Sequence, residues 1–134
     1  MSTSFARADH VHDTVLGRTS ATDVNQTSTS SGTDVVLTSM TLTPAAGTYW
    51  VYFDSTVVNS GNGAERVLVS LYVNGVQRAH TLKRIGIAGG AQSNVTIGDI
   101  VSVNGSQAID IRWRVPAGTG TCFERSLHVV RIGP

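Results

Sequence analysis

Hydrophobic and polar residues alternate most regularly between positions 109 and 115. Apolar side chains occupy the odd positions of this segment, including Trp113, while Asp110, Arg112 and Arg114 occupy even positions. Such alternation sends successive side chains to opposite faces of a β-strand. We therefore expect a strand with one buried face, which carries Trp113, and one polar face, which carries the three charged residues.

Further strands are indicated at 49–53, 67–73, 100–103 and 125–132, where β-branched and aromatic residues gather. Two Asn-Gly dipeptides, at 74–75 and 104–105, mark turns, because both residue types tolerate the positive φ of a tight hairpin. Helical periodicity never extends beyond a single turn. Short strands at regular spacing with Gly and Asn turns predict an all-β protein, and we expect a jelly-roll sandwich.

The first 33 residues differ in composition from the rest of the chain. They are polar and irregular, and the stretch from Thr19 to Asp34 is rich in Ser and Thr. Such a segment has too little apolar surface to fold alone. We therefore divide the chain into an extended N-terminal arm at 1–33, used for anchoring or trimerisation, and a jelly-roll β domain at 34–134.

Charge and cysteine content narrow the classes of function. The 134 residues carry 10 basic and 9 acidic side chains, a net charge of +1, which is not the basic footprint of a nucleic-acid-binding protein. No apolar run approaches the ~18 residues of a membrane span, and the single Cys122 can form no intrachain disulfide. These features favour a soluble protein made in a reducing cytoplasm, with neither nucleic acid nor an inserted membrane as partner.

Three segments of the predicted β domain resemble a known family. They are AGTYWVYFDSTVV at 46–58, LVSLYVNGVQRA at 68–79 and IGDIVSVNG at 97–105. In this order they are similar to strands of the trimeric jelly roll shared by complement and tumour-necrosis-factor-like domains, and bacteriophage virion proteins carry similar modules. The resemblance implies a homotrimer that buries one face of each sandwich against its own copies.

The N-terminal stretch ARADHVHD, residues 6–13, resembles an Ala-Arg-x-Asp-His-x-His element of phage tail-fibre proteins. This resemblance implies a bacteriophage virion surface protein, made in the host cytoplasm, that contacts other virion proteins. We expect a non-catalytic short fibre or spike that attaches to host surface glycans such as bacterial polysaccharide. The alternative is a capsid decoration, or cement, trimer with no external ligand, and the absence of a long repetitive shaft favours it.

His10 and His12 are the candidate metal ligands. In an extended backbone their side chains project on the same side, roughly 6.6 Å apart along the strand. Two imidazoles are too few for a stable transition-metal site, but three chains around a threefold axis would supply six. We expect either a divalent transition metal on that axis, with Asp9 and Asp13 accepting hydrogen bonds from the rings, or histidines that only hydrogen-bond along the arm.

Two groups of residues are candidates for the trimer interface. Trp50 and Tyr52 lie opposite the odd-numbered side chains of their strand, and we assign them to subunit contact ahead of sugar stacking. The polar face of Asp110, Arg112 and Arg114 has three interpretations. It forms ion pairs across a subunit boundary, binds an acidic glycan, or is a solvated face whose arginine stems cover apolar neighbours.

Two Gly-rich loops, one with Asn62 and Gly63 and the other with Gly118 and Thr119, are the expected ligand contacts, because binding residues concentrate on loops. No catalytic function is expected. The sequence contains no G-x-S-x-G motif, and the carboxylates that glycoside cleavage would need are spread over separate segments. We expect Cys122 to be a small residue of the core.

Overall fold

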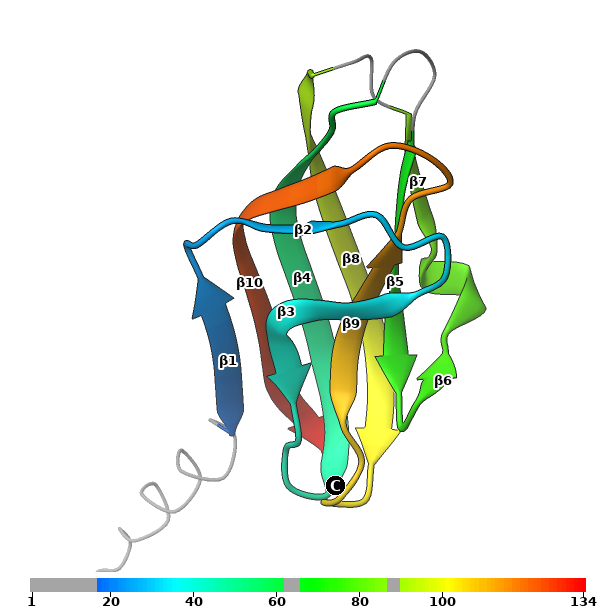
Figure 1. Ribbon diagram of the computed structural model, residues 1–134. Helices are drawn as coiled ribbons and strands as arrows, with labels where there is room; N and C mark the ends of the chain where they lie inside the picture. The colour runs from blue at the N-terminus through cyan, green and yellow to red at the C-terminus, as the bar shows by residue number, and fades with distance from the viewer. Residues whose placement is uncertain (1–16, 62–65, 87–89) are drawn as a thin grey trace, which may run out of the picture.

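The computed structural model describes residues 17–61, 66–86 and 90–134. In these ranges the chain forms two antiparallel β-sheets packed face to face (Figure 1). A 3-10 turn spans Ala79–Thr81, and the described residues include no helix long and apolar enough to cross a membrane. The strands are β1 (Arg18–Asp23), β2 (Thr27–Thr29), β3 (Val35–Leu42), β4 (Gly47–Asn59), β5 (Arg66–Val73), β6 (Val76–Gln77), β7 (Lys83–Gly86), β8 (Gln92–Val103), β9 (Ile109–Arg114) and β10 (Gly120–Gly133).

The strands divide between two sheets. Sheet A has the order β1-β10-β4-β8, with β2 also paired to β10, and sheet B has the order β3-β9-β5-β6, with β7 also paired to β5. Consecutive strands such as β8, β9 and β10 therefore lie in alternate sheets, and the chain crosses from one layer to the other. Each sheet turns one face to the shared core, so the two outer faces point to opposite sides of the molecule.

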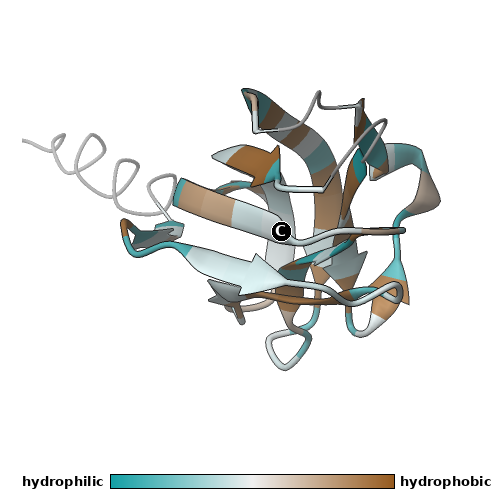
Figure 2. Ribbon diagram, turned by 45° about the horizontal axis from the view of Figure 1, so that its top comes forward, coloured by the Kyte–Doolittle hydropathy of each residue, from teal (hydrophilic) through white to brown (hydrophobic). Residues whose placement is uncertain are grey.

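Alternate residues of the long strands fill the space between the sheets, and Figure 2 shows the resulting bands of hydrophobic and hydrophilic colour. Every second residue of β4 is buried along its 13 positions. Trp113 is 2 % exposed and Cys122 is fully buried, so both lie in the core as expected. The prediction of an all-β sandwich is confirmed.

The Asn74-Gly75 turn is also confirmed. Asn74 has φ 53° and Gly75 has φ 77°, and the two residues connect β5 to β6, where Val73 lies opposite Val76. Positive φ at both central positions is the geometry that a two-residue type I′ hairpin requires. Glycine adopts positive φ without a steric penalty, and asparagine adopts it more readily than most other residues.

The β sandwich begins earlier in the chain than the sequence predicted. Residues 18–29, which we assigned to the extended arm, form β1 and β2, and both pair with β10. The prediction considered only apolar burial, which this Ser/Thr-rich segment lacks. The segment instead adds to an existing strand through its backbone, and its β-branched threonines suit an extended chain.

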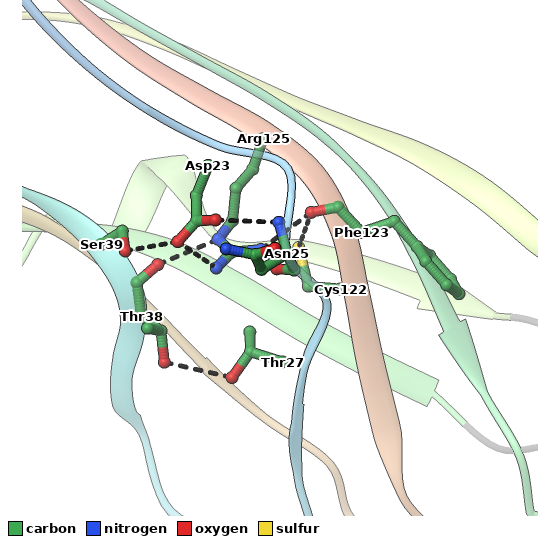
Figure 3. Close-up of polar contacts among 8 residues, drawn as sticks. All are labelled: Asp23, Asn25, Thr27, Thr38, Ser39, Cys122, Phe123 and Arg125. Atoms are coloured by element: carbon green, nitrogen blue, oxygen red, sulfur yellow. Dashed lines mark hydrogen bonds and ion pairs between the residues drawn. The ribbon is translucent and has the colours of Figure 1, made fainter.

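One buried arginine ties this N-terminal segment to the sandwich (Figure 3). Arg125 is 4 % exposed. Its Nε donates to the carbonyl of Thr38 at 2.9 Å, and its Nη1 donates to the carbonyls of Asn25 and Phe123, both at 2.8 Å. Its Nη2 lies 3.1 Å from the carboxylate of Asp23. The guanidinium therefore joins the β1–β2 turn, β3 and β10.

The local backbone is arranged around this contact. The register of β10 against β4 shifts between Cys122 and Arg125, and a β-bulge of this kind re-aims the side chains of a strand. Ser39 of β3, at φ 72°, donates its hydroxyl to the Asp23 carboxylate at 2.6 Å. Bonds from Ser39 and the Asn25 backbone, with the charge of Arg125, hold the pKa of Asp23 below its ordinary value.

Candidate functional site

The outer face of sheet A carries an exposed apolar patch. Trp50 and Tyr52 of β4 are 42 % and 40 % exposed, on the face opposite the buried residues of that strand. Their cross-strand neighbours are Ile100 and Gly98 on β8 and Val130 and His128 on β10. Ile100 is 52 % exposed. We call this surface, made of Trp50, Tyr52, Ile100 and Val130, the aromatic face.

A glycine allows the aromatic face to be flat at its centre. A Cβ placed on Gly98 would lie only 2.8 Å from Cη2 of the Trp50 indole. The ring of Trp50 therefore lies against the backbone of β8, at a position where any larger residue would push it away. This close approach keeps the exposed ring along the sheet.

Uncharged polar residues border the aromatic face along the β4–β8 pair, while Asp54 of β4 and Arg18 of β1 are its charged neighbours. Thr48 and Ser102 share a hydrogen bond at 2.9 Å across β4 and β8, and Thr56 donates to Asn94 at 3.1 Å farther along the same strand pair. An apolar centre with aromatic residues and few charges is the composition of the core of a protein–protein interface.

An open depression borders the aromatic face along β1 and β10. It has a volume of about 410 Å³. Residues 18–20 of β1 and 128–130 of β10 line it, among them Arg18, His128 and Val130. Val130 belongs to both the depression and the aromatic face. The two features therefore form one continuous surface on sheet A.

The charged candidates lie on the opposite side of the molecule. Asp110, Arg112 and Arg114 are residues of β9, whose outer face belongs to sheet B. The structure therefore does not bring them together with Trp50 and Tyr52 in one patch. The five residues grouped by sequence belong to two separate surfaces.

The β9 charges are paired within the chain. Asp110 is only 4 % exposed and accepts a hydrogen bond from Nε of Arg112 at 2.8 Å, while Arg114 donates to Asp34 at 3.0 Å. The Arg112 guanidinium also lies 4.3 Å from the ring centre of Tyr72. The hydrogen bond that Arg112 donates to Asp110 raises the pKa of Arg112 above its usual value. Asp110 is thus a buried partner, and only the arginines reach solvent.

The predicted ligand loops are described in part. Asn62 and Gly63 lie outside the described residues, as do His10, His12, Asp9 and Asp13. Gly118 has φ 76°, and a Cβ at this position would collide with the side chain of the buried Asn59. The carbonyl of Thr119 accepts the backbone N–H of Ser60 at 3.0 Å.

Asn59, which the sequence did not single out, organises this end of the sandwich. It is fully buried, and its Nδ2 donates to the carbonyls of Arg66 and Ala117, both at 3.0 Å. Its Oδ1 accepts the N–H of Gly61 at 2.8 Å. Asn59 therefore links the loop after β4 to the start of β5 and the loop before β10. Its position at the end of a strand, two residues before Gly61, is the one signal that could have indicated it.

Two of the reactive side chains in the described ranges, Cys122 and Asp99, have structural roles. Burial raises the pKa of the Cys122 thiol, which disfavours the thiolate that nucleophilic chemistry needs. Asp99 is bound by Arg78 and His80 at 2.8 and 3.1 Å. Among the described residues, no three His, Cys, Asp or Glu side chains are grouped as a metal site.

Comparison with known proteins identifies the fold. No family model and no curated protein matches the chain. The chain is similar to a chain in the structure of infectious bursal disease virus, Gx strain, with a TM-score of 0.61 and 11 % identity over 87 % of its length. The Gt strain gives the same three values. The globular domain of zebrafish complement 1qA protein gives a TM-score of 0.55 and 12 % identity over 81 % of this chain and 94 % of that one. The chain is a jelly roll.

The predicted jelly-roll fold is therefore confirmed. The chain spans 32 % and 33 % of the two virus chains, about a third of their length. The TM-scores of 0.61 and 0.55 establish the shared fold. Because the sequence identities are only 11–12 %, the function has to be argued from the surfaces of this chain.

Proposed function

We propose that this jelly roll is a non-catalytic structural protein that assembles as a homotrimer through its aromatic face. The observation that carries the proposal is the exposure of Trp50, Tyr52 and Ile100 side by side on sheet A. The core between the sheets is closed without them, so the monomer fold does not require them. Tryptophan and tyrosine are the residues that most often dominate binding energy when a second surface covers them.

In the proposed trimer, three sandwiches pack around an axis with sheet A turned inward. Each copy then covers the aromatic face of a neighbour, and the depression beside Val130 receives a neighbouring side chain. Sheet B faces outward. The resemblance of segments 46–58, 68–79 and 97–105 to trimeric jelly rolls supports this arrangement, as does the likeness of the fold to the zebrafish complement domain.

Light scattering of the purified chain tests the assembly. We expect a particle of three 14.1-kDa chains, and we expect Trp50→Ala with Tyr52→Ser to shift it to monomer, since removing an aromatic hot spot costs about 2 kcal/mol or more per interface. Val76→Ser is the control, because Val76 is 66 % exposed on the β5–β6 hairpin, outside the aromatic face. A wild-type monomer at micromolar concentration would refute the proposal.

We further propose that the trimer belongs to the surface of a bacteriophage or phage-like particle and attaches it to host surface glycans. The tail-fibre-like stretch at 6–13 supports this role. A glycan array tests it: reproducible binding to bacterial polysaccharide is expected of an attachment protein. Tight binding to undecorated capsids, without glycan binding, would instead identify a decoration trimer.

The N-terminal histidines belong to the same proposal. If His10 and His12 of three chains surround one divalent transition metal, elemental analysis of protein purified without chelator should find about one ion per three chains. Changing both histidines to alanine should remove the ion. If the wild-type trimer contains no metal, the metal site is refuted, and the remaining interpretation is that both histidines only form hydrogen bonds along the arm.

A further inference from the structure

Four arginines gather on the outer face of sheet B. Leu68 of β5 lies opposite Arg84 of β7 on one side and opposite Arg114 of β9 on the other. Arg66 lies two positions from Leu68 on the same strand, and Arg112 lies two positions from Arg114, so both share this face. We call the surface of Arg66, Arg84, Arg112 and Arg114 the arginine face.

The register explains why a leucine can lie at the centre of an outer face. Leu68 is only 5 % exposed, and its flanking neighbours across the sheet are two arginines. Long arginine side chains bury their aliphatic stems on apolar surface while their charged ends stay in water. The stems of Arg84 and Arg114 are thus placed to cover Leu68, and their guanidinium groups end at the surface close to one another.

Two of the four guanidinium groups are held in place. Arg114 donates to Asp34 at 3.0 Å and Arg112 donates to the buried Asp110 at 2.8 Å. The hydroxyl of Tyr72 donates to the same Asp34 carboxylate. These contacts orient both groups and use only one or two of the five N–H donors of each guanidinium.

The other two arginines carry the excess positive charge. Arg66 and Arg84 are exposed and form no ion pair among the described residues. Among the described residues of this face, the carboxylates of Asp34 and Asp110 neutralise the charges of two of the four arginines. The arginine face is therefore locally basic although the whole chain has a net charge of only +1.

We infer that the arginine face binds a carboxylated polysaccharide. Planar guanidinium forks match the geometry of carboxylates and bind them with two hydrogen bonds. Neighbouring strands are about 4.8 Å apart and alternate residues of a strand about 6.6 Å apart, so the four groups form an open grid. Such a grid suits a chain with repeated acidic groups, and this inference deepens, and rests on, the proposed attachment to host glycans.

The surroundings favour a polysaccharide over a nucleic acid. A protein that binds nucleic-acid single strands offers exposed aromatic rings for base stacking, but the Tyr72 ring on this face is covered by Arg112 at 4.3 Å. The arginine face also lies opposite the aromatic face. Trimerisation through sheet A therefore leaves it open to a ligand on the outside of the particle.

Binding to immobilised polygalacturonate, a polymer whose only charges are carboxylates, tests the inference. Neutral dextran and single-stranded DNA are the other two probes, and the full chain is used throughout. The test variant carries Arg66→Gln and Arg84→Gln. The matched control is Lys83→Gln, because Lys83 is exposed on β7 next to Arg84 but lies opposite Val69, on the other side of the strand.

We expect wild-type protein to bind polygalacturonate in a salt-dependent way and to ignore dextran. The double variant should bind at least about tenfold more weakly, since it loses the charge-assisted hydrogen bonds of two of the four guanidinium groups. It should also show a shallower salt dependence, while Lys83→Gln stays near wild type. Equal losses in Lys83→Gln and the double variant, or tighter binding to DNA than to polygalacturonate, would overturn the inference.

Light scattering of the same samples separates this inference from the proposed assembly. A trimer that fails to bind polygalacturonate overturns the arginine face as a ligand site and leaves the homotrimer standing. A monomer that binds polygalacturonate through Arg66 and Arg84 overturns the homotrimer and leaves the arginine face standing as a ligand site. The double arginine variant and Lys83→Gln should both keep the oligomeric state of the wild type, because none of these residues lies on sheet A.

Discussion

Asp99 accepts a hydrogen bond from Nε of Arg78 at 2.8 Å, and this contact fastens the 3-10 turn to β8, the edge strand of sheet A. The other oxygen of Asp99 accepts the N–H of Ile100, and Nη2 of Arg78 donates to the carbonyl of the same residue. Both backbone groups of Ile100 are thus occupied. Natural sheets use charges of this kind to stop an edge strand from pairing with another chain.

The Asp99–Arg78 contact predicts an acid-sensitive contribution to stability. Burial alone would raise the pKa of Asp99, but bonds from Arg78 and His80 more than offset it, so the pKa lies below the ordinary 3.8. A carboxyl group with a lowered pKa stabilises the fold above its unfolded pKa and loses that contribution as pH falls through its folded pKa. The window therefore lies below about pH 4.

Asp99→Asn should accordingly lower the free energy of unfolding by about 1 kcal/mol at pH 7. The difference from wild type should shrink at pH 3, because this pH lies below the pKa of an aspartate in the unfolded chain and the linked contribution is already being lost there. Urea titrations at both pH values measure it. Glu124→Gln, an exposed change on β10, serves as the control, and a deficit in Asp99→Asn that is equal at both pH values would contradict the assignment.

Gly98→Ala should disturb the aromatic face directly. The added methyl group would meet the Trp50 ring at 2.8 Å, so either the ring or β8 must move. Because the exposed Trp50 ring can turn away, we expect the free energy of unfolding to fall by no more than about 1 kcal/mol. We also expect a red shift in the fluorescence of Trp50 and weaker self-association. In Gly86→Ala the new methyl group meets nothing within 4 Å. This control should leave both the fluorescence and the assembly unchanged.

Replacing Arg125 should destabilise the fold both when its charge is removed and when only its planar guanidinium group is lost. Arg125→Met would leave the carbonyls of Thr38, Asn25 and Phe123 without this donor, while Asp23 would keep its bonds from Ser39 and the Asn25 backbone. Because a buried acceptor that loses its donor costs about 1–3 kcal/mol, we expect the free energy of unfolding to fall by about 2 kcal/mol or more. Arg125→Lys keeps the charge but loses the planar fork, so it should recover only part of the stability. Thermal unfolding measures both variants, with the exposed change Lys83→Met as reference. A fully stable Arg125→Met would refute the role of this contact.

Several features of the fold were predictable because they depend on local patterns. Alternation along 109–115 placed Trp113 in the core, and the Asn74-Gly75 turn followed from the need for positive φ. The outward direction of Trp50 and Tyr52 followed from the same two-residue period. Each of these inferences needs only the sequence of one strand or one turn.

The remaining features depend on which strands become neighbours. The pairing of β1 and β2 with β10 is made by backbone groups, which every sequence possesses. The burial of Asp110 depends on Arg112 of its own strand and on its cross-strand neighbours, Tyr72 of β5 and Thr41 of β3. Likewise, Arg66 and Arg84 join Arg114 only because β5, β7 and β9 align around Leu68. A register between distant segments leaves no mark in a single sequence.

Two buried serines offer a matched pair of stability tests. Ser55 of β4 is 3 % exposed, and among the described residues its hydroxyl oxygen has no hydrogen-bond partner. Ser70 of β5 is fully buried as well, but its hydroxyl accepts a hydrogen bond from Nε2 of Gln77 at 3.1 Å. A buried polar group without a partner costs free energy, whereas a satisfied one contributes about 1 kcal/mol.

Replacing each serine by alanine should therefore change stability in opposite directions. We expect Ser55→Ala to raise the free energy of unfolding by about 1 kcal/mol and Ser70→Ala to lower it by a similar amount or more, since Gln77 would lose its acceptor. Urea unfolding of both variants at pH 7 measures the difference. A shift of the same sign in both would contradict this account, because it would mean that removing the hydroxyl matters less than the small gap each substitution leaves in the packing.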